Sequence, residues 1–128
     1  SHIEALLTAF GISYSRGAVT ENGNKPDFLF PGAAQYADPA FEADRLTMLG
    51  AKSTLKERWR QVLSEAERIQ VKHLLTLEPG ISLKQTAEMQ AKQLQLVLPR
   101  DLHVTYKPEQ QAWLMDVADF IRLVQSRS

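Results

Sequence analysis

The sequence predicts an α/β protein in which a mixed sheet is flanked by helices. Apolar runs of strand length alternate with helical patterns in the second half of the chain, which is typical of helices packed on a sheet. Earlier, the turn signal Glu21-Asn22-Gly23-Asn24 separates two strand candidates. The 128 residues, 44% hydrophobic and 23% charged, suit one domain with a buried core.

The first half of the chain predicts one helix and three strands. Helical apolar spacing covers residues 3–10 and ends at Gly11. Strands are predicted over 12–20, 27–30 and 45–52. Residues 31–44 contain two prolines and many small residues, and we interpret them as an irregular loop.

The second half alternates helices with strands. Helices are predicted over 54–68, with Thr54 and Glu57 at capping-box spacing, over 83–92 after Ser82, and from Pro108 onward. Strands are predicted over 73–77 and 94–98. The last helix carries the apolar stripe Trp113, Leu114, Val117, Phe120, Ile121 and Val124. The predicted order is therefore α-β-β-β-α-β-α-β-α.

The composition of the chain limits the kinds of site and surface that it can form. The chain has no cysteine, which excludes disulfides and thiolate metal sites. No apolar run approaches the roughly 20 residues that span a bilayer, and no leader pattern is present. The formal net charge is zero, so any surface for a polyanion has to arise from local patterning. The start at Ser1-His2 is typical of an excised fragment, and we expect further chain upstream.

Two charged residues lie where a metal-dependent hydrolase would need them. Asp27 begins one predicted strand and Lys52 ends the next, so a hairpin would bring both to one edge of the sheet. Hydrolysis of a phosphodiester needs carboxylates for Mg²⁺, an activated water and a cation near the phosphate. Mg²⁺ keeps several waters, so two or three carboxylates and a lysine are sufficient.

Pro26-Asp27 followed by Lys52 resembles the PD-(D/E)XK nucleases. The usual second acid stands two residues before the lysine, but this chain has Gly50 there. EcoRII, NgoMIV and Cfr10I types take that acid from the following helix, and Glu65, thirteen residues after Lys52, matches it. On an α-helix Arg58 and Glu65 would fall within roughly 20° of each other, on a flank of the apolar stripe.

The resemblance is closest to the EcoRII-type restriction endonucleases. It rests on the stretches KPDFLFP (25–31), KSTLKERWRQV (52–62), HLLTL (73–77), LQLVLP (94–99) and LHVTY (102–106), and covers roughly residues 3–124. It implies a single nuclease domain over 1–128 and a Mg²⁺ cofactor. It also implies site-specific cleavage of double-stranded DNA at CCWGG-like sites, leaving 5′-phosphates, by a cytoplasmic bacterial or archaeal enzyme. A near-palindromic site favours a homodimer.

The same resemblance assigns further roles. Lys56, Glu57 and Arg58 take the family's base-reading positions, and their chemistry suits guanine O6 and N7 and cytosine N4. Tyr36 occupies a position associated with the family's active site. Glu4 resembles an auxiliary acid of some relatives. The catalytic set is thus Asp27, Lys52, Glu65 and Tyr36, with Asp27 and Glu65 on the metal.

Each residue also has an ordinary structural interpretation. Asp27 suits a turn, Lys52 a solvated strand end, and Glu65 an ion pair with Arg68 or Lys72 on a wet helix face. His73, His103 and the aromatic residues Trp59, Trp113 and Phe120 are interpreted as structural. The alternative functions are a DNA-binding module that does not cleave, a mismatch-nicking repair endonuclease of the same fold, and a protein-interaction domain.

Overall fold

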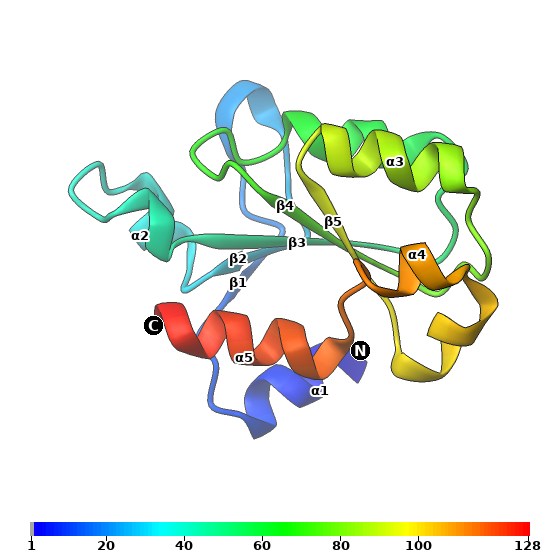
Figure 1. The fold of residues 1–128 in the computed structure, drawn as a ribbon. Coiled ribbons are helices and arrows are strands. Elements are labelled where there is room, and N and C mark those ends of the chain that lie inside the picture. Colours follow the sequence, from blue (N-terminus) through cyan, green and yellow to red (C-terminus); the bar gives the residue numbers. More distant parts are fainter. Residues whose placement is uncertain (1) are drawn as a thin grey trace.

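The computed structural model describes residues 2–128 and is built on one five-stranded sheet with the order β1-β2-β3-β4-β5 (Figure 1). The strands are β1 (Ser15–Arg16), β2 (Phe28–Phe30), β3 (Thr47–Lys52), β4 (Lys72–Thr76) and β5 (Leu94–Val97). β1, β2 and β3 pair antiparallel, whereas β3, β4 and β5 pair parallel. The predicted mixed sheet is confirmed.

Helices cover both faces of the sheet (Figure 1). α1 (His2–Ala9) and α5 (Val117–Arg127) lie on one face, and α3 (Leu83–Ala91) lies on the other. Shorter elements complete the chain: α2 (Ala33–Ala37), α4 (Pro108–Gln111) and the 3₁₀ segments η1 (Glu21–Gly23), η2 (Ala43–Arg45), η3 (Arg58–Ser64) and η4 (Arg100–Thr105). Ser82 caps α3 as predicted, because its hydroxyl accepts from Gln85 N at 3.2 Å.

The sheet separates two apolar cores, because side chains alternate between its faces. On the α3 side, strand residues Met48, Leu74 and Leu96 pack with Trp59 and Val62 of η3. On the opposite side, Phe28, Phe30 and Leu49 pack with Phe120, Ile121 and Val124 of α5 and Leu7 of α1. The interpretation of Trp59 and Phe120 as core aromatics is confirmed, while Trp113 is only partly buried.

Two early predictions were wrong in extent. The strand predicted over 12–20 is only Ser15–Arg16. Gly17 N still donates to Asp27 O in register with β2, but its φ of +66° turns the chain out of the extended conformation. The predicted loop over 31–44 contains α2 and the start of η2.

The α-helix predicted over 54–68 is wrong. Its centre is the 3₁₀ segment η3, and Lys56 just before it has a φ of +46°. In an α-helix, Leu55 N would be a first-turn N–H group without a partner inside the helix. Here it donates to the Glu78 carboxylate at 3.0 Å. The predicted cap residue Thr54 instead accepts from Arg58 through its carbonyl, at 2.8 Å, and its hydroxyl, at 3.3 Å. The angular argument that joined Arg58 to Glu65 therefore does not apply.

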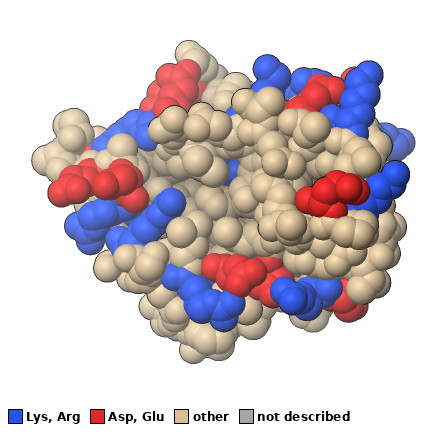
Figure 2. All heavy atoms as spheres, viewed as in Figure 1, with Lys and Arg blue, Asp and Glu red and all other residues tan. Residues whose placement is uncertain are grey.

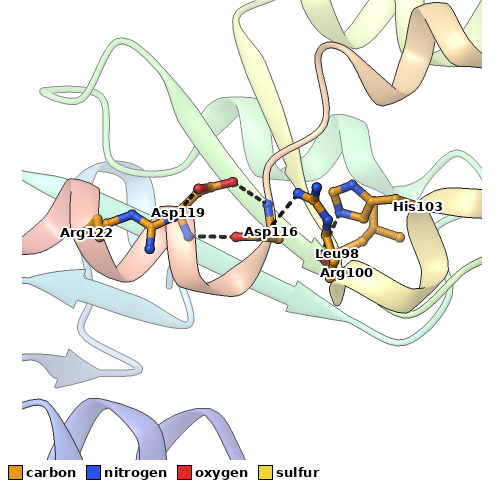
Figure 3. A network of polar contacts seen from close by, with 6 residues as sticks. All are labelled: Leu98, Arg100, His103, Asp116, Asp119 and Arg122. Carbon is orange, nitrogen blue, oxygen red and sulfur yellow. Dashed lines mark hydrogen bonds and ion pairs between the residues drawn. The ribbon is translucent and has the colours of Figure 1, made fainter.

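The single helix predicted from Pro108 is two helices. The chain leaves α4, and Met115 pairs with the sheet beside Val97, donating to Leu96 O at 3.2 Å. Asp116 then starts α5 as a capping box, accepting from Asp119 N at 2.7 Å while its own N–H donates to the Asp119 carboxylate (Figure 3). The apolar stripe of Phe120, Ile121 and Val124 is nevertheless buried as predicted.

Candidate active site

Asp27 immediately precedes β2 and is held against the end of β3. The β2–β3 register pairs Phe28 with Leu49, so Asp27 lies beside the last residues of β3. Its Oδ2 accepts a hydrogen bond from Ala51 N at 2.7 Å. Because alternate residues share a face, Asp27 and Lys52 both point to the α3 side, as Leu29 and Gly50 do. The structure therefore places Asp27 and Lys52 at the same end of the β2–β3 pair, as expected.

Lys52 is the half-buried last residue of β3 and lines an open groove of about 650 Å³. The groove runs between α1, the ends of β3 and β4, and the start of α5, so it lies on the α1–α5 face of the sheet, opposite the α3 side to which the Lys52 side chain is directed. Its opposite side includes Arg100 and Asp116, which form an ion pair at 3.4 Å (Figure 3). Most of the surface between them is apolar, and Ile3, Leu6 and Val117 contribute to it.

Glu65 follows η3 in an extended conformation, with φ −83° and ψ 147°. Its side chain is half-buried, and its Oε1 is a buried oxygen with no hydrogen-bond partner among the described residues. The pKa of this carboxyl is raised to about 7, chiefly by burial and next by the negative charge of Asp27, against the opposing effect of Lys52 and Lys72. Glu65 is thus close enough to Asp27 and Lys52 to feel both charges.

Gly50 lies where the PD-(D/E)XK pattern has its second acid, and the structure leaves little room for a side chain there. A Cβ at this position would lie 3.2 Å from Leu74 Cδ1 and 3.4 Å from Val62 Cγ2. The space that a carboxylate would need is filled by η3, which packs directly on the strand. The same packing lets η3 deliver Glu65 to the strand end from outside the sheet.

The residues present fit a Mg²⁺ ion. Asp27 and Glu65 supply the oxygen ligands that Mg²⁺ prefers, and a buried oxygen without a donor is the group that a cation would satisfy. Within residues 2–128, no cluster of three or more His, Cys, Asp or Glu side chains has the arrangement of a metal site. Such a site would therefore rest on these two carboxylates and retained water, as is usual for Mg²⁺.

The proposed base readers lie in a turn, not at a helix start. Lys56 and Glu57 form the turn before η3, Arg58 begins η3, and all three are exposed. The turn is fixed on both sides by Leu55 and Trp59, which have no exposed surface. The three side chains therefore project from a firmly anchored turn close to Lys52.

Tyr36 and Glu4 bind partners other than Asp27 and Glu65. The Tyr36 hydroxyl donates to the Glu21 carboxylate, with distances of 2.6 and 2.8 Å to its two oxygens, and accepts from Arg68 N at 3.1 Å. Burial and the adjacent Glu21 raise the pKa of Tyr36 to about 12, which leaves it a firm proton donor at neutral pH. Glu4 pairs with Arg16 at 2.5 Å and with the Tyr14 hydroxyl at 3.2 Å.

The wet-face interpretation of Glu65 is wrong. The Arg68 guanidinium binds backbone carbonyls of the α2 region, those of Gln35, Tyr36, Asp38 and Phe41. The buried ammonium of Lys72 donates to Ala66 O at 2.8 Å and to Ile69 O. His73 and His103 are both buried, and His103 Nε2 lies 3.0 Å from Leu98 O (Figure 3).

Sequence reasoning missed Glu21 and Lys72. Glu21 stood in a segment that we interpreted only as a turn, and Lys72 only as an ion-pair partner on the surface. A polar side chain in an Asn-Gly turn gives no local sign that it will bind a segment more than forty residues away. The buried position of Lys72, at 6% exposure, is set by tertiary packing alone.

The fold and the site together define an α/β protein with a mixed sheet, in which two carboxylates and a lysine meet at the end of β3. The chain belongs to the EcoRII C-terminal family, whose model matches residues 1–121. It is 44% identical over 121 residues to the type II restriction enzyme EcoRII of Escherichia coli. That match includes 94% of this chain but spans only 30% of the length of EcoRII.

Two solved structures of Ecl18kI have the same fold. Metal-depleted Ecl18kI in complex with uncleaved, modified DNA superposes with a TM-score of 0.82 at 23% identity, and the complex with uncleaved DNA gives 0.80 at 22%. Each match covers 98% of this chain and 42% of the Ecl18kI chain. Over residues 2–128, no helix combines the length and apolar character that a membrane crossing requires.

Proposed function

We propose that this chain is the nuclease domain of a type II restriction endonuclease of the PD-(D/E)XK class. The observation that carries the proposal is the buried, unpartnered Glu65 oxygen beside Asp27 and Lys52. Membership of the EcoRII C-terminal family and the DNA-bound state of the Ecl18kI structures support the same function. A cytoplasmic location in a bacterium or archaeon is part of this proposal, in keeping with the bacterial source of EcoRII.

The proposed reaction is hydrolysis of a DNA phosphodiester to a 5′-phosphate and a 3′-hydroxyl. Asp27 and Glu65 hold Mg²⁺, which when bound neutralises charge on the phosphate and acidifies a coordinated water. Lys52 donates to the attacking water or to a phosphate oxygen, so it orients the nucleophile and balances the charge that develops. The hydrogen bond from Ala51 N keeps Asp27 directed at the same place. Water oxygen joins phosphorus as the bond to O3′ breaks.

Specificity is proposed to come from Lys56, Glu57 and Arg58. Their exposed side chains project from the turn that follows Lys52, so base reading and cutting would be fixed to one another by a few residues. Arg and Lys donate to guanine, and Glu accepts from the cytosine amino group. The proposed target is a CCWGG-like duplex, and a near-palindromic target calls for a homodimer in which each subunit cuts one strand.

Cleavage of a CCWGG duplex in Mg²⁺ tests the reaction. We expect wild-type protein to cut both strands, and Asp27→Asn and Lys52→Ala to reduce the rate by at least about 1000-fold, because each removes a group that acts on the reacting phosphate. Asp38→Asn is the matched control: Asp38, like Asp27, accepts from a backbone N–H, that of Ala40 at 2.9 Å. Lys92→Ala, an exposed residue at the end of α3, controls for loss of a lysine.

Other outcomes of this assay would assign another function. Retained cutting by Asp27→Asn or Lys52→Ala would refute the proposed site. Binding of the duplex without cutting would indicate a DNA-binding module, and cutting of one strand at a mismatch would indicate a repair endonuclease.

The role of the reading turn has its own test. We expect Arg58→Ala to lower discrimination against a substituted C:G pair by roughly 5- to 150-fold, the value of one good bidentate contact. Arg60→Ala is the control, because Arg60 lies in the same segment but is paired with Glu88 of α3. Rates on duplexes with single substituted pairs give the measurement, and equal discrimination by wild type and Arg58→Ala would remove Arg58 from the proposed reader.

A further inference from the structure

Glu65 stands in a stretch, residues 65–68, that is neither helix nor strand, and its own N–H donates to Val62 O at the end of η3, at 3.1 Å. Side chains of a distant turn bind the backbone around it. Asn24 Nδ2 donates to Ser64 O at 3.0 Å, on one side of Glu65. On the other side, Ala66 N donates to Thr20 Oγ1 at 3.3 Å. The backbone on both sides of this carboxylate is therefore bound by the segment 20–24.

The pair formed by Glu21 and Tyr36 extends this attachment. The Glu21 carboxylate accepts from the Tyr36 hydroxyl at 2.6 Å and from Glu67 N at 3.2 Å. The Tyr36 hydroxyl in turn accepts from Arg68 N at 3.1 Å. Tyr36 is only 7% exposed, so its bonds to Glu21 and Arg68 N are partly shielded from competing water, whereas the bond from Glu67 N to Glu21 is exposed. Two further N–H groups after Glu65 are thus bound by one partly buried pair.

The same turn leads directly to Asp27. Its ends are closed by Thr20 N, which donates to Asn24 O at 2.7 Å, and by Asn24 Nδ2, which also donates to Glu21 O at 3.1 Å. Only two residues separate Asn24 from Asp27. One short, closed segment therefore ends just before the first carboxylate and binds the backbone beside the second, which links their positions.

We propose that Glu21 and Tyr36 are positioning residues that set the Glu65 carboxylate against Asp27 and thereby set the affinity for the divalent cation. This inference rests on the proposed function. Groups that hold a metal ligand in place influence affinity without touching the metal, and their loss costs roughly 10- to 100-fold in affinity or activity. Neither residue needs to touch DNA or water in the reaction.

Binding of Mn²⁺, which takes the same oxygen ligands as Mg²⁺, tests the proposal directly on the full chain. Titration followed by electron paramagnetic resonance gives the affinity without any cleavage. We expect Tyr36→Phe and Glu21→Ala to weaken Mn²⁺ binding by roughly 10-fold or more. Glu21→Gln keeps an acceptor for Tyr36, and we expect it to regain part of the loss. In cleavage, the variants should need more Mg²⁺ than the wild type to reach half of their own maximal rate.

Tyr106→Phe is the matched control. Tyr106 is 4% exposed and its hydroxyl donates to Glu78 O at 2.6 Å, so the variant also loses one buried tyrosine hydrogen bond. We expect its Mn²⁺ affinity to equal that of the wild type. Circular dichroism confirms folding, and Glu21→Gln supplies the measurement if Glu21→Ala unfolds.

The possible outcomes distinguish a failure of this inference from a failure of the proposed function on which it rests. Wild-type Mn²⁺ affinity in folded Tyr36→Phe and Glu21 variants, with loss of affinity in Asp27→Asn, would overturn the positioning role alone. An equal loss in Tyr106→Phe would also overturn it, since general loosening of the core would then be the cause. A wild-type protein that binds no Mn²⁺ would overturn the proposed function, and the inference with it.

Discussion

A half-buried carboxylate whose oxygen lacks a donor makes the folded protein less stable whenever it is ionised. Glu65 is such a group, with a pKa of about 7 against an ordinary value of 4.5. A raised pKa in the folded state contributes stability below pH 4.5 that is lost as the pH rises through 7. At neutral pH the ionised Glu65 carboxylate therefore destabilises the metal-free protein, whereas the same negative charge would favour binding of a cation.

Glu65→Gln is accordingly expected to stabilise the metal-free protein. At pH 8 we expect a gain of about 1–2 kcal/mol in the free energy of unfolding, after allowing for the screening of a half-exposed group. The gain should nearly vanish at pH 4, where glutamate is neutral in both states. Urea unfolding at both pH values, with a chelator present, measures it.

Glu109→Gln, a change at an exposed residue of α4, is the control for Glu65→Gln. A gain for Glu65→Gln that does not depend on pH would contradict the explanation. The same variant should lose Mn²⁺ binding, so stability and affinity are expected to move in opposite directions.

At the scale of elements, the contact between η3 and β3 decides where the second acid can be. Gly50 permits that contact, because any Cβ would meet Leu74 and Val62. We expect Gly50→Ala to cost about 1–3 kcal/mol through overpacking. Gly50→Asp should cost more, since it also buries an unpaired charge. Denaturant unfolding measures both, and Ala51→Ser, at an exposed neighbouring position, should stay within about 0.5 kcal/mol of wild type.

Restored cutting in Gly50→Asp combined with Glu65→Gln would contradict this account. It would show that the strand position accepts the acid after all.

The strands and the segment 54–68 also show how much of the structure the sequence could predict. Asp27 and Lys52 were located correctly because strand ends are signalled locally, by Pro26 on one side and the Ser53-Thr54 polar stop on the other. The helix over 54–68 was not, because apolar spacings of three and four residues fit both 3₁₀ and α geometry. The hydrogen bond found in place of this helix, from Leu55 N to the Glu78 carboxylate, joins residues 23 apart in the chain, so no local sequence pattern indicates it. Glu65 was therefore identified from resemblance, while the helical geometry offered in its support was wrong.

At the scale of the whole molecule, positive and negative charges are balanced in number. The net charge is zero, and Figure 2 shows basic and acidic side chains interspersed over the viewed face instead of a continuous basic surface. Attraction to DNA would then depend on a few local cations, and we expect a shallow dependence of binding on salt concentration. This balance is the reason that composition alone gave no sign of a nucleic-acid partner.

Global stability should fall in acid because of His73. This side chain is 2% exposed; burial, and secondarily the charge of Arg127, lower its pKa to about 4 from 6.5. A lowered pKa gives stability that is complete above pH 6.5 and is lost as the pH falls toward 4. We expect a loss of about 2 kcal/mol from this group between pH 7 and pH 5.

His73→Leu, of similar volume, should remove that loss and also the unpartnered Nδ1. Thermal or urea unfolding at the two pH values measures the difference. His103→Gln is the comparison, since His103 is also buried but its Nε2 lies 3.0 Å from Leu98 O. If His73→Leu lost as much stability between pH 7 and pH 5 as the wild type does, His73 would be ruled out as the cause.

The glycine at position 50 also bears on how related genes are found and aligned. A search that demands an acid two residues before the lysine discards this chain, although Glu65 lies close enough to Asp27 and Lys52 to interact with both charges. We expect positions 50 and 65 to covary among homologues: glycine at 50 should accompany an acid at 65, and an acid at 50 should free position 65 to drift. The signature of these enzymes is then a pair of linked alignment columns, fifteen apart in this chain, and not a contiguous string.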